Sequence, residues 1–114
     1  ETKILGDISF VFYNAEEFLK INMKYLSHDS ITDVITFNYS VGNKINGDIF
    51  INMDCVIVNS KKFKTKFETE LYRVMIHGVL HLVNYKDKTK NEKKLMRKKE
   101  DSYLSFLPKK LIVS

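Results

Sequence analysis

The chain has 114 residues, a formal net charge of +5 and 44% hydrophobic residues, which predicts one folded domain, over residues 1–114, with a single core. Its only cysteine, Cys55, excludes an internal disulfide framework and a cysteine-based zinc finger, and suits a reducing cytoplasm. No apolar stretch is long enough to span a bilayer, so we expect a cytoplasmic protein with no membrane partner. The basic charge favours a polyanionic partner.

The first half of the chain is predicted to form strands with one helix between them. Aromatic and β-branched residues over 8–13 indicate a strand, and 16–26 indicates a helix. Further strands are expected over 32–39 and 48–53. The loop over 43–47 contains an Asn-Gly turn, so these two strands should form an antiparallel hairpin.

The second half of the chain is predicted to form three helices. Asp54 is expected to cap a helix that ends near Phe63. A capping-box pattern over 65–68 is expected to open the next helix, and a last one should run from after Thr89 to about Phe106. Because strands precede helices with little alternation, the predicted class is α+β, with a small mixed sheet of about four strands packed with helices.

Two histidines, His77 and His81, lie four residues apart in the most apolar part of the chain. Residues at this spacing project from one face of a helix, so both imidazoles can reach one ion. A short turn after the helix can return Asp87 to that ion. Three protein ligands with an open fourth position are typical of a catalytic zinc site.

The competing interpretation is that these are ordinary helix histidines with separate partners. Segment 71–83 is apolar nearly all round, so its helix should be central to the core, and buried histidines need partners. We therefore expect one Zn²⁺ per chain, held by His77, His81 and Asp87. An N,N,O ligand set does not distinguish zinc from nickel or iron.

Lysines crowd around and after the candidate ligands, where an approaching phosphate would meet them first. A solvated helix face is the alternative explanation of this charge. The predicted RNA-binding residues are Lys86, Lys88, Lys90, Lys93, Lys94, Lys98 and Lys99.

Together these residues resemble the YbeY family of bacterial metal-dependent endoribonucleases. The family signature His-Gly-x-Leu-His-Leu-x-Gly-Tyr-Asp-His is similar to residues 77–87 here. Further similar motifs, in the same order along the chain, are Thr32–Phe37, Gly47–Ile49, Glu70–Leu71, Met96 and Glu100.

The resemblance implies a metzincin-like central helix that carries both histidines. It also implies zinc-dependent cleavage of single-stranded RNA during maturation of the 3′ end of small-subunit ribosomal RNA, and a part in ribosome quality control. The implied partners are ribosomal RNA and the small ribosomal subunit with its proteins, and no DNA.

Three positions depart from the family pattern. Asp87 stands at the third histidine, and aspartate is a competent zinc ligand. Leu26 stands where the family has an arginine that serves the substrate phosphate, and one of the lysines named above is expected to replace it. Asn84 replaces a glycine in the turn, and asparagine tolerates left-handed backbone angles.

Two alternatives to RNA cleavage stay open. In the first, the metal is structural in a non-catalytic RNA-binding or ribosome assembly factor, which Leu26 favours. The second is a metalloprotease. In a His-Glu-x-x-His protease the residue after the first histidine is the general base, and here that residue is Gly78. The sequence names no general base for RNA cleavage.

Overall fold

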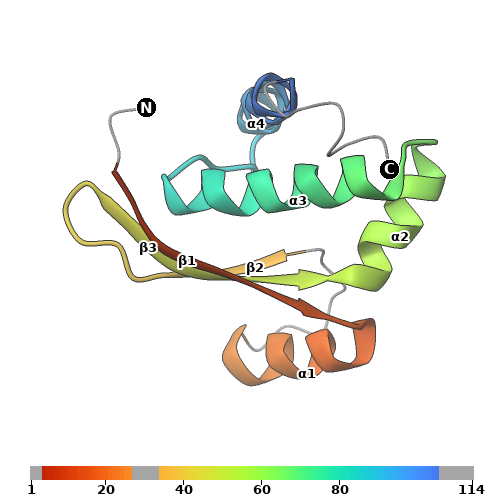
Figure 1. Cartoon of the computed structure of the whole chain (residues 1–114), viewed down its shortest axis with the longest axis horizontal. Coiled ribbons are helices and arrows are strands. Elements are labelled where there is room, and N and C mark those ends of the chain that lie inside the picture. Colours follow the sequence, from red (N-terminus) through yellow and green to blue (C-terminus); the bar gives the residue numbers. More distant parts are fainter. Residues whose placement is uncertain (1–3, 27–33, 106–114) are drawn as a thin grey trace.

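The computed structural model describes residues 4–26 and 34–105, which form a three-stranded sheet with helices on both faces. The elements are β1 (Ile4–Tyr13), α1 (Ala15–Leu26), β2 (Val34–Asn38), β3 (Lys44–Asn52), α2 (Met53–Lys62), α3 (Phe67–Leu82) and α4 (Lys90–Leu104). Helix α1 covers one face of the sheet and α3 the other, and α4 lies on the outer side of α3 (Figure 1). None of the helices in this part of the chain has the length and apolarity needed to cross a membrane.

The sheet has the strand order β1-β3-β2, with β3 in the centre. Strand β1 runs parallel to β3 and β2 runs antiparallel to it, so the sheet is mixed as predicted. The predicted antiparallel pairing of the second and third strands is confirmed, with Ile35 opposite Phe50. The predicted count of about four strands is not confirmed, since the described residues form three. The predicted start of the second strand, at residue 32, lies outside the described residues.

The main core lies between β3 and α3. Alternate residues of β3 face the helix, and Ile45, Ile49 and Ile51 are almost fully buried there. They pack with Val74 and Leu82 of α3 in one cluster. The most apolar helix is therefore the central one, as its sequence predicted.

Two glycines allow α3 to lie directly on the central strand. A Cβ atom at Gly78 would lie 2.6 Å from Cγ2 of Ile49, and one at Gly47 would lie 2.8 Å from Cδ2 of Leu82. Neither position has room for a side chain without movement of the helix or the strand. Because Gly78 follows His77, this contact also fixes where the histidine helix sits.

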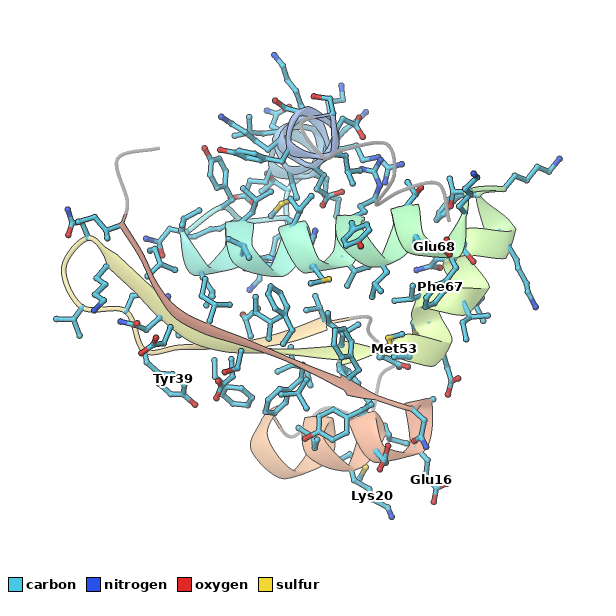
Figure 2. All side chains as sticks on the ribbon, in the orientation of Figure 1. Glu16, Lys20, Tyr39, Met53, Phe67 and Glu68 are labelled. Carbon is cyan, nitrogen blue, oxygen red and sulfur yellow. The ribbon has the colours of Figure 1, made fainter. Side chains whose placement is uncertain are left out.

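The other face of the sheet is covered by α1. Phe18 of this helix is 1% exposed, and on the same side the Phe37 and Phe50 rings of neighbouring strands lie 5.2 Å apart between centroids. Glu16 and Lys20 lie on the outer side of α1, away from the sheet (Figure 2). In the part of the chain that the structure describes, the only cluster of metal-ligating side chains lies on the opposite side of the sheet, at α3.

The predicted cap of α2 is wrong. The helix begins one residue earlier than Asp54, and Asn52 caps it by accepting a hydrogen bond from the backbone N–H of Cys55 at 3.3 Å. Asp54 instead accepts a bond from the backbone N–H of Ala15 at 2.8 Å, which ties α2 to the start of α1. Both are side chains that cap helices well, so local sequence does not separate them.

The capping box predicted for α3 is also wrong. Its N-cap residue is Lys66, and no side chain caps this end. Phe67 and Glu68 form the first turn beside the end of α2 (Figure 2), and Phe67 packs on the core. A complete capping box is found instead at the start of α4, between Thr89 and Glu92. The last helix therefore starts after Thr89 as predicted, and its predicted end at residue 106 lies outside the described residues.

Candidate metal centre and cleft

The structure brings the predicted metal ligands His77, His81 and Asp87 together. Nε2 of His81 lies 2.9 Å from Nε2 of His77, and Oδ2 of Asp87 lies 3.1 Å from Nε2 of His77 and 3.4 Å from Nε2 of His81. In a tetrahedral zinc site with bonds of roughly 2.0–2.1 Å, two ligand atoms are about 3.3 Å apart. The residues present therefore fit one ion of this size.

A left-handed residue after α3 returns the chain to the histidines. Asn84 has a φ of 74°, which an asparagine adopts more readily than most residues. Its backbone N–H donates to the carbonyl of His81 at 3.0 Å, and that of Tyr85 donates to the carbonyl of Leu80 at 3.0 Å. These bonds satisfy the end of the helix in the manner of a Schellman turn. The turn carries Asp87 back over the last helical turn, so the predicted tolerance of Asn84 is confirmed.

A buried carboxylate of α4 contacts His77 on its other nitrogen. Glu100 is 5% exposed, and its Oε2 lies 2.5 Å from Nδ1 of His77. This leaves Nε2 of His77 directed at His81 and Asp87. A carboxylate behind a ligand histidine fixes the orientation of the ring and makes it a stronger ligand.

Arg73 joins this carboxylate to the rest of α4. Its Nη1 donates to Oε1 of Glu100 at 3.1 Å, and its Nη2 donates to Oδ1 of Asp101 at 2.7 Å. Burial acts to lower the pKa of Arg73, but its hydrogen bonds with Asp101 and Glu100 outweigh this and raise the pKa. The guanidinium stays charged and offsets the buried charge of Glu100.

Sequence reasoning missed the Arg73–Glu100–His77 chain as a unit. Glu100 was identified through the family resemblance, without a role. A signal was present, because Met96 and Glu100 are one turn apart and both face α3. A charged residue on a buried helix face needs a partner.

A cleft of about 260 Å³ runs beside the candidate ligands. Residues of α2, α3 and α4 line it, and it reaches His77 and Asp87. The positively charged side chains that line the cleft are those of Arg73, Lys93 and Arg97.

The predicted RNA-binding lysines separate into groups. Lys93 lines the cleft, whereas Lys99 lies over the ring of Tyr85 with its Nζ 5.6 Å from the centroid. The others are exposed and do not line it: Lys86, Lys88, Lys90, Lys94 and Lys98. Arg73 and Arg97 line the cleft but were outside the predicted set. The turn between Lys93 and Arg97, on the side of Glu100, was the signal that could have found Arg97.

The replacement of the family arginine, absent at Leu26, by one of the lysines stays a prediction. Helix α1 ends at Leu26, whose side chain lies outside the part of the molecule that is described. Lys93 and Arg97 are the cations of α4 that a phosphate in the cleft would meet.

Comparison with known proteins identifies the family. The model of the family Endoribonuclease YbeY matches residues 1–108. Endoribonuclease YbeY of Flavobacterium psychrophilum is 50% identical over 106 residues, which cover 93% of this chain and 76% of the relative. That of Karelsulcia muelleri is 48% identical over 112 residues, covering 98% and 79%. The solution structure of TM1509 from Thermotoga maritima superposes with a TM-score of 0.64 at 29% identity, over 86% of this chain and 65% of that one. The chain belongs to the YbeY family of endoribonucleases.

Proposed function

We propose that this chain, as a single domain, is a zinc-dependent endoribonuclease that cleaves single-stranded ribosomal RNA in the cytoplasm. The proposed substrate is the 3′ end of small-subunit ribosomal RNA, with the small subunit and its proteins as partners and no DNA. The observation that carries the proposal is the close spacing of the His77, His81 and Asp87 ligand atoms beside a cleft that is lined by positively charged side chains. The family of the chain supports RNA as the substrate.

Two imidazole nitrogens and one carboxylate oxygen are ordinary zinc ligands, and they leave a fourth position for substrate or water. A Zn²⁺ held there supplies Lewis acidity toward a phosphate oxygen and a lowered pKa for water. The side chains of His77 and His81 are 18% and 25% exposed, and that of Asp87 is 38% exposed. This access favours a catalytic site over a closed structural one.

The protein's own side chains have separate tasks in this proposal. Glu100 holds the ring of His77 in the orientation that directs Nε2 toward the other ligands. Lys93 and Arg97 hold the phosphate and offset the negative charge that grows on it during cleavage. Because these charges are in place before the substrate arrives, little reorganisation is needed at the moment of reaction.

The metalloprotease alternative is disfavoured by packing as well as by sequence. The position after the first histidine, Gly78, lies against Ile49 of β3, where even a Cβ atom would be 2.6 Å from Cγ2. The glutamate that a His-Glu-x-x-His protease carries there as its base has no room.

The proposal is tested by a cleavage assay on three substrates with the same nucleotide sequence: a single-stranded RNA, a double-stranded RNA and a single-stranded DNA. We expect the zinc-loaded protein to cut only the first, and chelation to stop it. Asp87→Ala should abolish cleavage, whereas Asp7→Ala, a matched change on exposed β1, should not. A protein that binds one zinc and RNA but cuts nothing is instead the non-catalytic assembly factor.

A further inference from the structure

An exposed aromatic side chain lines the cleft and has no task in the proposed chemistry. Phe63 follows the last residue of α2 and is 51% exposed, although it is among the residues that line the cleft. A single exposed hydrophobic residue is ordinary on a protein surface. Phe63 differs because its ring borders the space in which the substrate is proposed to lie.

Phe63 and the metal ligands lie toward opposite ends of the cleft. The end of α2 lies beside the start of α3 (Figure 1). Phe63 is the C-cap residue of α2 and stands four residues before Phe67, where α3 begins, so it is near the N-terminal end of α3. Asp87 follows the other end of α3. Along the helix, the cleft extends from Glu70 to His77, which at 1.5 Å per residue is about 10 Å. A ligand that reaches both ends is longer than one phosphate group.

The chemistry of the two ends differs. Toward Phe63, the lining includes Asn59 and Glu70, whose side chains offer an amide and a buried carboxylate. A carboxylate repels phosphate, so the phosphates of a bound strand are expected nearer Lys93 and Arg97, whereas an amide such as that of Asn59 can hydrogen-bond to the edge of a base. The Nζ of Lys62 lies over the Phe63 ring, 5.5 Å from its centroid, which places a cation at one face of the ring for a neighbouring phosphate and leaves the other face as the one on which a base would stack.

We propose that Phe63 is a stacking platform for one base of the bound RNA, on a nucleotide that flanks the cleaved phosphate. Lys93 and Arg97 then hold the backbone from α4 while the base lies against the ring. Every base has a face that stacks on an aromatic side chain, so this contact selects unpaired strands rather than a sequence. The inference rests on the proposed function and names the path of the substrate strand.

Binding of a 2′-O-methyl RNA oligonucleotide to the zinc-loaded protein, measured by fluorescence anisotropy, tests the platform without cleavage. Phe63→Ala should weaken binding by at least about five-fold, and Phe63→Trp should preserve it. Phe12→Ala is the matched control, because Phe12 is 47% exposed on β1 and outside the cleft. It should bind like the wild type.

A second oligonucleotide, with abasic nucleotides throughout, separates stacking from indirect effects. Phe63→Ala should bind it as the wild type does, because it has no base to stack. Equal loss of affinity for both oligonucleotides, or no loss for either, would overturn the platform. If the wild type cleaves RNA and Phe63→Ala is unaltered, only this inference fails. If the wild type neither binds nor cleaves RNA, the proposed function fails with it.

Discussion

Helices α3 and α4 both line the cleft, but different interactions hold them in place. Helix α3 lies on the sheet through buried side chains such as Val74 and Leu82, and no side chain caps its N-terminus. Helix α4 is highly charged, buries few residues, among them Met96 and Glu100, and begins with a complete capping box. Tertiary packing fixes the first helix, and local hydrogen bonds define the start of the second.

This difference divides the tasks within the site. The two histidines stand on the helix that the core positions, so changes on α3 should disturb stability and metal binding together. Most of the charges that orient a ligand or meet the substrate stand on α4, so changes there should alter affinities more than stability. The predictions below test this division, from the largest expected effect to the smallest.

The largest effect is expected from the histidines of α3. The double variant His77→Ala/His81→Ala should lose metal completely, from about one ion per chain to none by elemental analysis. His28→Ala, which changes the remaining histidine, is the control and should keep its metal. The metal-loaded wild type should also unfold at a higher temperature than the metal-free wild type, because a ligand at one hundred times its Kd adds about 2.7 kcal/mol to the free energy of unfolding. Full metal retention in the double variant would show that His77 and His81 do not bind the metal.

The second prediction concerns the contact between α3 and β3. Gly78→Ala places a Cβ atom 2.6 Å from Cγ2 of Ile49, so helix or strand must move. Overpacking of this kind costs about 1–3 kcal/mol, and the better helix propensity of alanine returns up to about 1 kcal/mol. We expect a net loss of stability in urea and a weaker affinity for metal, because His77 moves with the helix. Unchanged metal affinity would show that the site tolerates displacement of α3.

The third prediction concerns the carboxylate of α4. Glu100→Gln should lower the metal affinity by about 10- to 100-fold, the usual effect of removing the partner of a ligand histidine. Asp101→Asn is the matched control, because Asp101 also pairs with Arg73 but is 57% exposed and has no contact with His77 among the ion pairs of the described residues. An exposed pair contributes little, so its effect on metal affinity should be small. Equal effects of the two variants would mean that Glu100 acts through charge and not through its contact with His77.

The fourth prediction separates two pairs of cations on α4. Lys93→Gln/Arg97→Gln removes two charges that line the cleft, and Lys94→Gln/Lys98→Gln removes two at the same spacing on the exposed side. The first variant should bind single-stranded RNA more weakly, with the log–log salt slope reduced by roughly 0.7 for each phosphate that is no longer neutralised. The second should change little. Similar reductions in both variants would mean that RNA follows the whole charged helix and not the cleft.

The helix starts show what the sequence predicts and where it fails. The pattern Thr-x-x-Glu occurs at Thr65 and at Thr89, but only Thr89 forms a capping box. The start of α3 is set by Phe67, which packs on the core, and such packing is not visible in four residues of sequence. At the start of α4 the described residues are not buried to a comparable extent, so the capping box sets where the helix begins.

The candidate site shows the same limit. The spacing of His77 and His81 follows from helix geometry alone, and the left-handed turn at Asn84 follows from residue preference. Both were predictable because they are local. The contact between Glu100 and His77 joins residues far apart in the chain, and the choice of Lys93 over Lys94 depends on how α4 rotates against α3.

The smallest effect is expected at the start of α4. The backbone N–H of Thr89 donates to Glu92 at 2.9 Å, and this bond lowers the pKa of the Glu92 carboxyl below its ordinary value. The ionised carboxylate therefore stabilises the folded state above the unfolded pKa of about 4.3, and this contribution is lost as pH falls through the lower folded pKa. Glu92→Gln keeps an acceptor but removes the charge.

Its melting temperature should lie slightly below that of the wild type at pH 7, with the difference shrinking as the pH falls below about 4. Metal-free protein should be used, so that release of metal at low pH does not contribute to the melting temperature. A difference that stays constant down to about pH 3 would mean that the hydrogen bond matters and the charge does not. The start of helix α4 would then be stabilised by hydrogen bonds whose strength does not depend on charge. It would differ from the start of α3 only in having a side chain that caps it.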